Sequence, residues 1–169
     1  MIVIEPPSSD AGPASSLAAG TKQELARFLT RARKAVGVDG EVTVLLADDA
    51  RLKELNRSFR GKNKPTDVLS FPAAANDDGI AGDIAISIET AALQAAEHGH
   101  TLPEELRILM LHGVLHIAGL DHETDKGEMR AREQELRTKL KLPIGLIERA
   151  QPAIKKVAAR KVAAKRAPR

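Results

Sequence analysis

The chain has 169 residues, of which 43% are hydrophobic and 29% are charged, proportions typical of one soluble globular domain. No apolar run reaches the roughly 18 residues that a membrane span needs, and residues 1–6 lack the features of a secretory signal, so we expect a cytoplasmic protein without membrane association. The chain contains no cysteine, which excludes disulfides, thiolate catalysis and cysteine-based metal sites. With three Phe, no Trp and no Tyr, the composition also argues against RNA binding through the stacking of bases on aromatic side chains.

The net charge of +3 hides an asymmetry between the two ends of the chain. Residues 150–169 carry seven basic side chains and no acidic one. Without these seven, 19 of the 26 basic side chains remain against 23 acidic ones, so residues 1–149 have a net charge of −4. We therefore expect one folded domain over residues 1–149 and a disordered basic tail over 150–169. The tail is either an arm that binds polyanions or an inert solvated extension.

Apolar periodicity predicts four strands and five helices in the folded part. The predicted strands cover residues 1–4, 41–47, 68–71 and the alternating segment with Ile84, Ile86 and Ile88. Residues 5–20 are rich in Pro, Ser, Ala and Gly and are expected to form an irregular connection. The predicted helices cover residues 21–37, a segment from Asp49, a segment from Ser87 or Glu89 to Gly99, residues 102–118, and a segment from about Asp125. This order predicts an α+β fold, with a small mixed β-sheet of about four strands packed against about five helices.

Capping patterns set several of these helix starts. Thr21-Lys-Gln-Glu24 and Thr101-Leu-Pro-Glu104 both have the form of a capping box. Asp49 is expected to cap the second helix. The apolar face of that helix is predicted to consist of Leu52, Leu55 and Phe59.

The last helix shows three Glu-to-base pairs at i,i+4 spacing, which are Glu128–Arg132, Glu133–Arg137 and Glu135–Lys139. Such pairs stabilise a helix by only about 0.2–0.5 kcal/mol each. We therefore predict that this face of the helix is solvated and holds no functional side chain.

Three of the five histidines lie within eleven residues, in a segment that runs from His112 to His122. Residues i and i+4 lie on one face of a helix, so His112 and His116 present two imidazoles together. Gly119 stands where the helix must end, and the left-handed conformation that glycine tolerates can bring His122 back towards the pair. The surrounding helix is apolar nearly all round and is expected to be buried, where unpaired imidazoles cost stability. We predict a metal site with three imidazole ligands and one open position, as in catalytic zinc sites; the alternative is that these are histidines without a ligand.

The spacing H-x-x-x-H-x-x-G-x-x-H equals that of the metzincin peptidases. Those enzymes need a glutamate directly after the first histidine as general base. Gly113 occupies this place and cannot accept a proton, so the sequence argues against a peptidase.

The same segment resembles the signature H-G-x-L-H-x-x-G-x-D-H of the YbeY family, which are bacterial metal-dependent endoribonucleases of ribosomal RNA maturation. Residues 60–72 (RGKNKPTDVLSFP) resemble the second motif of the family and residues 82–84 (GDI) its third, so the resemblance covers about residues 21–140. It implies an α+β fold with a metal cleft beside a long buried central helix. It also implies a single-strand-specific endoribonuclease of ribosomal RNA precursors, with the small ribosomal subunit and an assembly GTPase as partners. The basic tail is a departure from the family pattern, and the resemblance implies no role for it.

The resemblance extends to individual residues. His112, His116 and His122 match the family's three metal ligands, which are usually taken to hold one zinc ion. Arg60 matches an arginine regarded as essential for RNA cleavage.

Four further residues near these motifs have side chains that could bind RNA, take part in catalysis or support the site. A planar guanidinium suits the charge on the equatorial oxygens of a phosphoryl group, which fits Arg60. Lys62 and Lys64 would add charges along the RNA backbone, although this loop alone has the composition of a solvated polar turn. Asp121 adjoins His122 and could orient a ligand imidazole or contact a metal-bound water, which would give it a catalytic role. Asp83 is expected to be structural.

Two other functions stay open at this level. One is a metal-dependent hydrolase of another substrate, because three histidines do not specify one. The other is a ribosome-assembly factor that binds RNA and holds a mainly structural metal. The sequence does not fix the metal, because imidazole suits Zn, Ni, Cu and Fe alike, and it leaves the general base, the cleavage position and the oligomeric state open.

Overall fold

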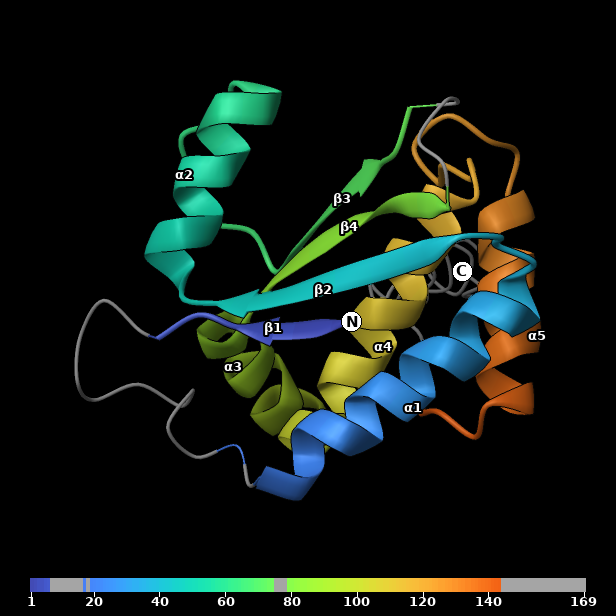
Figure 1. Ribbon diagram of the computed structural model, residues 1–169, viewed down its shortest axis with the longest axis horizontal. Helices are drawn as coiled ribbons and strands as arrows, with labels where there is room; N and C mark the ends of the chain where they lie inside the picture. Colours follow the sequence, from blue (N-terminus) through green and yellow to red (C-terminus); the bar gives the residue numbers. More distant parts are fainter. Residues whose placement is uncertain (7–16, 18, 75–78, 144–169) are drawn as a thin grey trace, which may run out of the picture.

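The computed structural model describes residues 1–6, 17, 19–74 and 79–143. The predicted basic tail at 150–169 and most of the predicted connection at 5–20 lie outside these residues. The described part contains four strands and five helices (Figure 1), which are β1 (Ile2–Ile4), α1 (Ala19–Val36), β2 (Glu41–Ala47), α2 (Asp49–Arg60), β3 (Val68–Pro72), β4 (Ile80–Ser87), α3 (Ile88–His98), α4 (Leu102–Ile117) and α5 (Glu128–Lys139). None of these helices is long and apolar enough to cross a membrane.

The strands form one mixed sheet in the order β1-β2-β4-β3. β2 pairs in parallel with both β1 and β4, whereas β3 runs antiparallel to β4. On the two central strands, Val44 lies beside Ile84 and Leu46 beside Ile86, and all four side chains are buried. Alternation of this kind gives the sheet one apolar face for the core. The predicted α+β fold with a small mixed sheet is confirmed.

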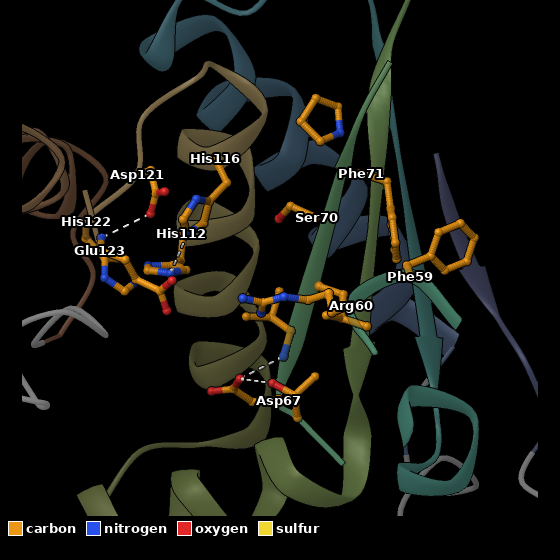
Figure 2. A pocket seen from close by; sticks show the side chains of 14 residues that line it. Phe59, Arg60, Asp67, Ser70, Phe71, His112, His116, Asp121, His122 and Glu123 are labelled. Carbon is orange, nitrogen blue, oxygen red and sulfur yellow. Dashed lines mark hydrogen bonds between the residues drawn. The ribbon is translucent and has the colours of Figure 1, made fainter. Parts of the chain in front are cut away.

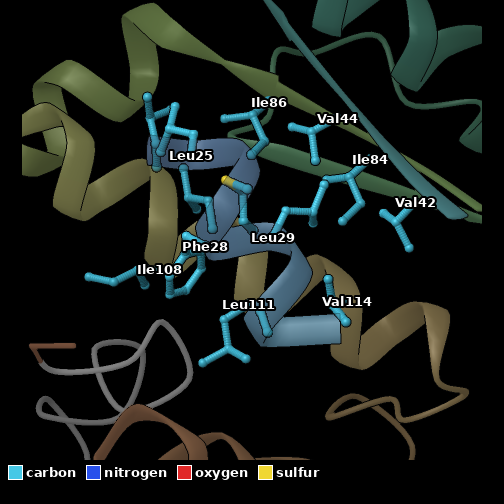
Figure 3. Close-up of a cluster of buried hydrophobic side chains, with 14 of the residues drawn as sticks. Leu25, Phe28, Leu29, Val42, Val44, Ile84, Ile86, Ile108, Leu111 and Val114 are labelled. Carbon is cyan, nitrogen blue, oxygen red and sulfur yellow. The ribbon is translucent and has the colours of Figure 1, made fainter. Parts of the chain in front are cut away.

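Helix α4 forms the centre of the core. It contacts β3, β4, α1, α3 and α5 (Figure 1), and ten of its residues are buried. Figure 3 shows its residues Ile108, Leu111 and Val114 in one cluster with side chains of α1 and of the sheet. A helix enclosed on so many sides must be apolar nearly all round, as the sequence predicts. Helix α2 packs on the other face of the sheet, where Leu52 belongs to a smaller apolar cluster.

Some predicted helix starts are wrong by one to three residues. α1 begins at Ala19, so Thr21 and Glu24 lie inside the helix. Asp48, and not Asp49, caps α2, because Asp48 has the extended backbone that a cap needs and its Oδ1 accepts a hydrogen bond from Arg51 N. The capping box at Thr101 is confirmed.

Asp49 has a different role from the predicted one. Its Oδ1 accepts hydrogen bonds from Ser87 Oγ and from Thr90 Oγ1. In return, Glu89 Oε2 accepts from Asp49 N at 2.8 Å. These bonds join the first turns of α2 and α3, which the sequence could not place side by side.

Two further boundaries also differ. β4 begins at Ile80 and stops at Ser87, so Ile88 is the first residue of α3 and not part of the strand. Ile88 is buried in the same core as Ile84 and Ile86, which explains why the alternation continues across the boundary. α5 begins at Glu128, because the carboxylate of Asp125 accepts hydrogen bonds from two backbone N–H groups just before and inside the first turn.

The predicted apolar face of α2 is wrong at its last position. Leu52 is buried and Leu55 is partly buried, but Phe59 is 67% exposed. The ring of Phe59 meets the ring of Phe71 edge-on, with 5.0 Å between the centroids. The C-terminal end of α2 therefore presents an aromatic ring to solvent.

Candidate metal centre

The centre is built on the last two turns of α4. His112 is 4% exposed and His116 is half-buried, one helical turn further on. Their spacing of four residues places both imidazoles on the same side of the helix, as predicted (Figure 2). The apolar packing of α4 against the sheet holds the backbone of both residues in place.

The turn after α4 brings the third histidine to the first two. Gly119 has φ of +89°, the left-handed conformation that the sequence predicts at this position. Asp121 then fixes the following turn, because its Oδ1 accepts from Glu123 N at 3.0 Å and its Oδ2 accepts from Thr124 Oγ1 at 3.2 Å. His122 lies inside this turn and faces the other two imidazoles (Figure 2).

The distances between the three imidazoles suit a shared metal ion. Nε2 of His112 and Nε2 of His116 lie 3.2 Å apart. One nitrogen from each of the three histidines lies within 4.8 Å of the others. In a tetrahedral zinc site with Zn–N bonds of about 2.0–2.1 Å, two ligand nitrogens lie about 3.3–3.4 Å apart. The His112–His116 distance is close to this value, and a nitrogen of His122 lies within 4.8 Å of both, so the three residues fit such an ion.

A buried carboxylate supports the first ligand from behind. His112 Nδ1 donates to Oε1 of Glu133 at 3.1 Å, and both side chains are almost completely buried. This bond keeps the proton on Nδ1 and leaves Nε2 free for a metal, the arrangement found behind many metal-bound histidines.

The contact corrects the prediction for α5. We expected Glu133 on a solvated face, paired with Arg137, but Glu133 is 2% exposed and faces α4. Met129 and Leu136, four residues before and three after, are also buried, so Glu133 stands in the middle of an apolar stripe. The position of this glutamate between apolar residues on one helix face could have predicted its burial, but its i,i+4 spacing from Arg137 suggested a solvated ion pair instead.

The local electrostatics favour the forms that bind a cation. Burial lowers the pKa of His116, and the electrostatic influence of the neighbouring His112 and His122 side chains lowers it further. The hydrogen bond from the Glu123 backbone lowers the pKa of Asp121, and that from Thr124 adds to it. At neutral pH, His116 is therefore an uncharged imidazole, as metal binding requires, and Asp121 is a carboxylate.

The histidines form one wall of a cavity of about 720 Å³. The opposite wall consists of the end of α2 and residues 66–72, which include β3. Arg60 and Asp121 line this cavity together with the three histidines. Figure 2 shows the Arg60 side chain between the histidines and the Phe59–Phe71 pair. Residues 52 positions apart in the sequence, Arg60 and His112, thus share one site.

The two predicted lysines lie outside this cavity. Lys62 and Lys64 are exposed on the loop between α2 and β3, and the cavity lining contains neither of them. The loop is anchored by Asn56, a buried side chain that the sequence analysis did not single out, whose Nδ2 donates to Lys64 O at 2.8 Å. Asp83, predicted to be structural, lies in β4 opposite Phe71 and does not line the cavity.

Gly113 has a packing role that explains the missing glutamate. A Cβ atom at this position would lie 2.8 Å from Cδ1 and 2.9 Å from Cγ2 of Ile84. Gly113 therefore lets α4 approach β4 closely, and Ser70 Oγ donates to its carbonyl oxygen at 3.3 Å. A side chain here would point into the sheet and not towards the histidines, so no general base can stand at this position.

Comparisons with known proteins agree with the site. The family model described as Endoribonuclease YbeY matches residues 11–141. A relative from Koribacter versatilis named Endoribonuclease YbeY is 62% identical over 145 residues, which are 86% of this chain and 94% of the relative. A relative of the same name from Solibacter usitatus is 51% identical over 125 residues, 74% of this chain and 83% of the relative.

A solved structure agrees as well. The solution structure of a Thermotoga maritima protein is 31% identical, with a TM-score of 0.50, and the match covers 83% of this chain and 89% of that one. The family match includes the three histidines and the loop with Arg60. This chain therefore belongs to the YbeY endoribonuclease family.

Proposed function

We propose that the protein is a metal-dependent endoribonuclease that cleaves single-stranded RNA, acts on ribosomal RNA precursors and works in the cytoplasm. The observation that carries this proposal is the meeting of three histidines and Arg60 in one cavity. The family and the names of the relatives support RNA as the substrate. The small ribosomal subunit and an assembly GTPase, implied by the family resemblance, are part of the same proposal.

His112, His116 and His122 are the proposed holders of one zinc ion per chain. An ion held there supplies Lewis acidity and activates water at neutral pH. Glu133 keeps His112 in the tautomer whose Nε2 is free. The buried helix α4 fixes two of the ligands, so little reorganisation is needed when the site fills.

Arg60 is the proposed contact for the phosphodiester group. Its guanidinium offers two parallel N–H donors to phosphoryl oxygens, and this geometry suits the charge that grows on them during cleavage. Arg60 is the last residue of α2, and Gly61 ends the helix behind it. The side chain therefore starts from a rigid element and not from the loop.

Three more residues take supporting roles in the proposal. Lys62 and Lys64, exposed on the loop that follows Arg60, attract the neighbouring phosphates of the strand. Asp121 holds the turn of His122 through both of its oxygens. Because it also lines the cavity, we propose that it contacts the attacking water from there.

The test is cleavage of end-labelled single-stranded RNA by the purified protein, with and without a chelator, next to casein and a duplex of the same RNA. We expect internal cuts in the single strand that stop with chelator and return when zinc is restored. Cleavage of casein but not RNA would assign the site to another hydrolase. Tight RNA binding without cleavage by zinc-loaded protein would assign the chain to an assembly factor with a structural metal.

A further inference from the structure

Phe59 is the most exposed of the three phenylalanines and lines the cavity of the candidate site. It is 67% exposed at the end of α2, directly before Arg60. Its ring meets the Phe71 ring at an interplanar angle of 64°. An edge-on contact of this kind covers at most one face of a ring, so Phe59 keeps a flat apolar face towards solvent.

Exposure of one large apolar side chain is not by itself evidence of a site, because single exposed apolar residues are common on protein surfaces. The position of Phe59 is what distinguishes it. Phe59 and Phe71 line the same cavity as Arg60 and the three histidines. The sequence around Phe59, residues 55–66, contains basic side chains and no acidic one, and the next residue, Asp67, lines the cavity.

The aromatic pair also borders a second hollow. This hollow has a volume of about 430 Å³ and lies on the outer face of the sheet. Apart from Thr43 and Asp83, its lining is apolar. Phe59 and Phe71 therefore line both a charged cavity and an apolar hollow.

A nucleotide likewise has a charged part and a largely apolar part, because its ribose carries a phosphate and a flat base. We propose that Phe59 stacks on a base of the substrate RNA while the adjacent Arg60 binds the phosphate of the same stretch of strand. The inference rests on the proposed function, because it takes RNA as the substrate of this cavity. It also explains a preference for single strands, whose bases are free to unstack and lie against a protein ring.

The scarcity of aromatic residues does not oppose this role. The composition predicts against base stacking on aromatic side chains, but it does not show where the few rings lie, and one ring beside the reacting phosphate is enough to position one nucleotide. Stacking is tolerant of base identity, because every base has a flat face. The contact with Phe71 holds the Phe59 ring in place, so less side-chain freedom is lost when a base binds.

The chain suits a direct spectroscopic test, because it contains no Trp and no Tyr. In the variant Phe59→Trp, all tryptophan emission comes from position 59. Metal-loaded Phe59→Trp protein is mixed with a single-stranded oligoribonucleotide, and separately with an abasic oligomer of the same length and charge, and emission is read within seconds. We expect strong quenching by the RNA and little by the abasic oligomer. Equal responses to both oligomers, or none to either, would overturn the inference.

The matched control is Leu93→Trp. Leu93 is 66% exposed on α3 and does not line the cavity, so we expect its emission to change little with either oligomer. Quenching at position 93 as strong as at position 59 would show that RNA binds without a defined subsite, and it too would overturn the inference.

Cleavage kinetics give the second measurement. In Phe59→Leu the apolar surface remains and the flat ring is lost. We expect KM for single-stranded RNA to rise about 5-fold or more, the loss of one stacked base, with metal content and kcat close to those of the parent chain. An unchanged KM in Phe59→Leu would contradict the subsite.

The two proposals fail separately. Quenching at position 59 without RNA cleavage by the parent chain would count against the proposed reaction and leave the base subsite standing. Cleavage by the parent chain without a response at position 59 would overturn the subsite alone.

Discussion

At the residue scale, the centre depends on what lies behind its ligands as much as on the ligands. Each imidazole must present a nitrogen without a proton to the metal. Because His112 is buried, only a neighbouring side chain or backbone group, and not solvent, can fix its tautomer. The carboxylate of Glu133 fixes the tautomer with the proton on Nδ1 by accepting a 3.1 Å hydrogen bond from it. A neutral acceptor at this position would hold the ring less firmly.

We expect Glu133→Gln to weaken zinc affinity about 10-fold, the lower end of the range for changes behind a metal ligand. The measurement is a competition titration against a chelator of known affinity. Glu135→Gln is the matched control, because Glu135 lies two residues away on α5 with a side chain that is 62% exposed. Equal affinities for the parent chain and Glu133→Gln would show that the carboxylate has no part in holding the metal.

The three histidines differ in how firmly the fold positions them. His112 and His116 stand on a buried helix, whereas His122 is exposed and depends on the turn that Asp121 holds. We still expect His112→Ala, His116→Ala and His122→Ala each to lose bound metal and activity, because two imidazoles do not hold an open site tightly. Elemental analysis of the purified variants decides this. One metal per chain in any variant would remove that histidine from the ligand set.

At the scale of the elements, the contact between α4 and β4 places the histidines. At position 113 there is no room for a Cβ atom, because the side chain of Ile84 packs against this position. Ile84 is completely buried and branched at Cβ. We expect Gly113→Ala to lower the free energy of unfolding, because overpacking costs about 1–3 kcal/mol, which exceeds the up to about 1 kcal/mol of helix propensity that alanine adds. Urea denaturation measures the change.

Ile84→Val supplies the control for this explanation. Alone it costs about 0.5–1.5 kcal/mol, but it removes the Cδ1 atom that lies nearest to the new methyl group. We expect the double variant to be less destabilised than the two single effects predict together. If the two destabilising effects are additive, contact with Ile84 is not the reason why glycine is needed at position 113.

Elements with a local cause were predictable from the sequence. The spacing of His112 and His116, the glycine after them and the capping box at Thr101 all act within a few residues, and the structure agrees with each. Contacts between distant segments were not predictable. Glu133 meets His112 across 21 residues, and Asp49 joins α2 to the start of α3, so periodicity and pair patterns within one helix could not reveal either.

Phe59 shows the opposite error. Its spacing from Leu52 and Leu55 is correct for a buried helical face, and the prediction fails because the end of α2 is not covered. Periodicity states which residues share a face of a helix, but only packing determines how far along the helix that face is covered. The ring that the pattern assigned to the core is the one we place against the substrate.

At the scale of the whole molecule, charge is divided between the two parts of the sequence. Residues 1–149 have a net charge of −4, and residues 150–169 carry seven basic side chains. If the tail is an RNA-binding arm, its cations release counterions from the strand, and at about 0.7 per phosphate on single strands they add about 3–5 to the log–log salt slope. Residues 1–149 alone should then bind RNA with a flatter salt dependence and lower affinity at low salt.

Titration of labelled RNA with the full chain and with residues 1–149 at several salt concentrations tests this. Cleavage of a short saturating substrate should be nearly the same for both, because the metal centre lies within the described residues of the domain. Equal salt slopes would leave the tail as an inert extension.

The central claim is that Arg60 and the three histidines act together on one phosphodiester. The most direct measurement is single-turnover cleavage of end-labelled single-stranded RNA by zinc-loaded parent chain, Arg60→Lys and Arg57→Lys, with metal content determined in each sample. Arg57 lies one turn earlier on α2 and is exposed outside the cavity, so its lysine variant controls for the exchange itself. We predict that Arg60→Lys keeps its metal and loses about 10²–10³-fold in rate, as when a donor to developing charge is removed, while Arg57→Lys stays near the parent rate. Cleavage by Arg60→Lys at the parent rate would contradict the account.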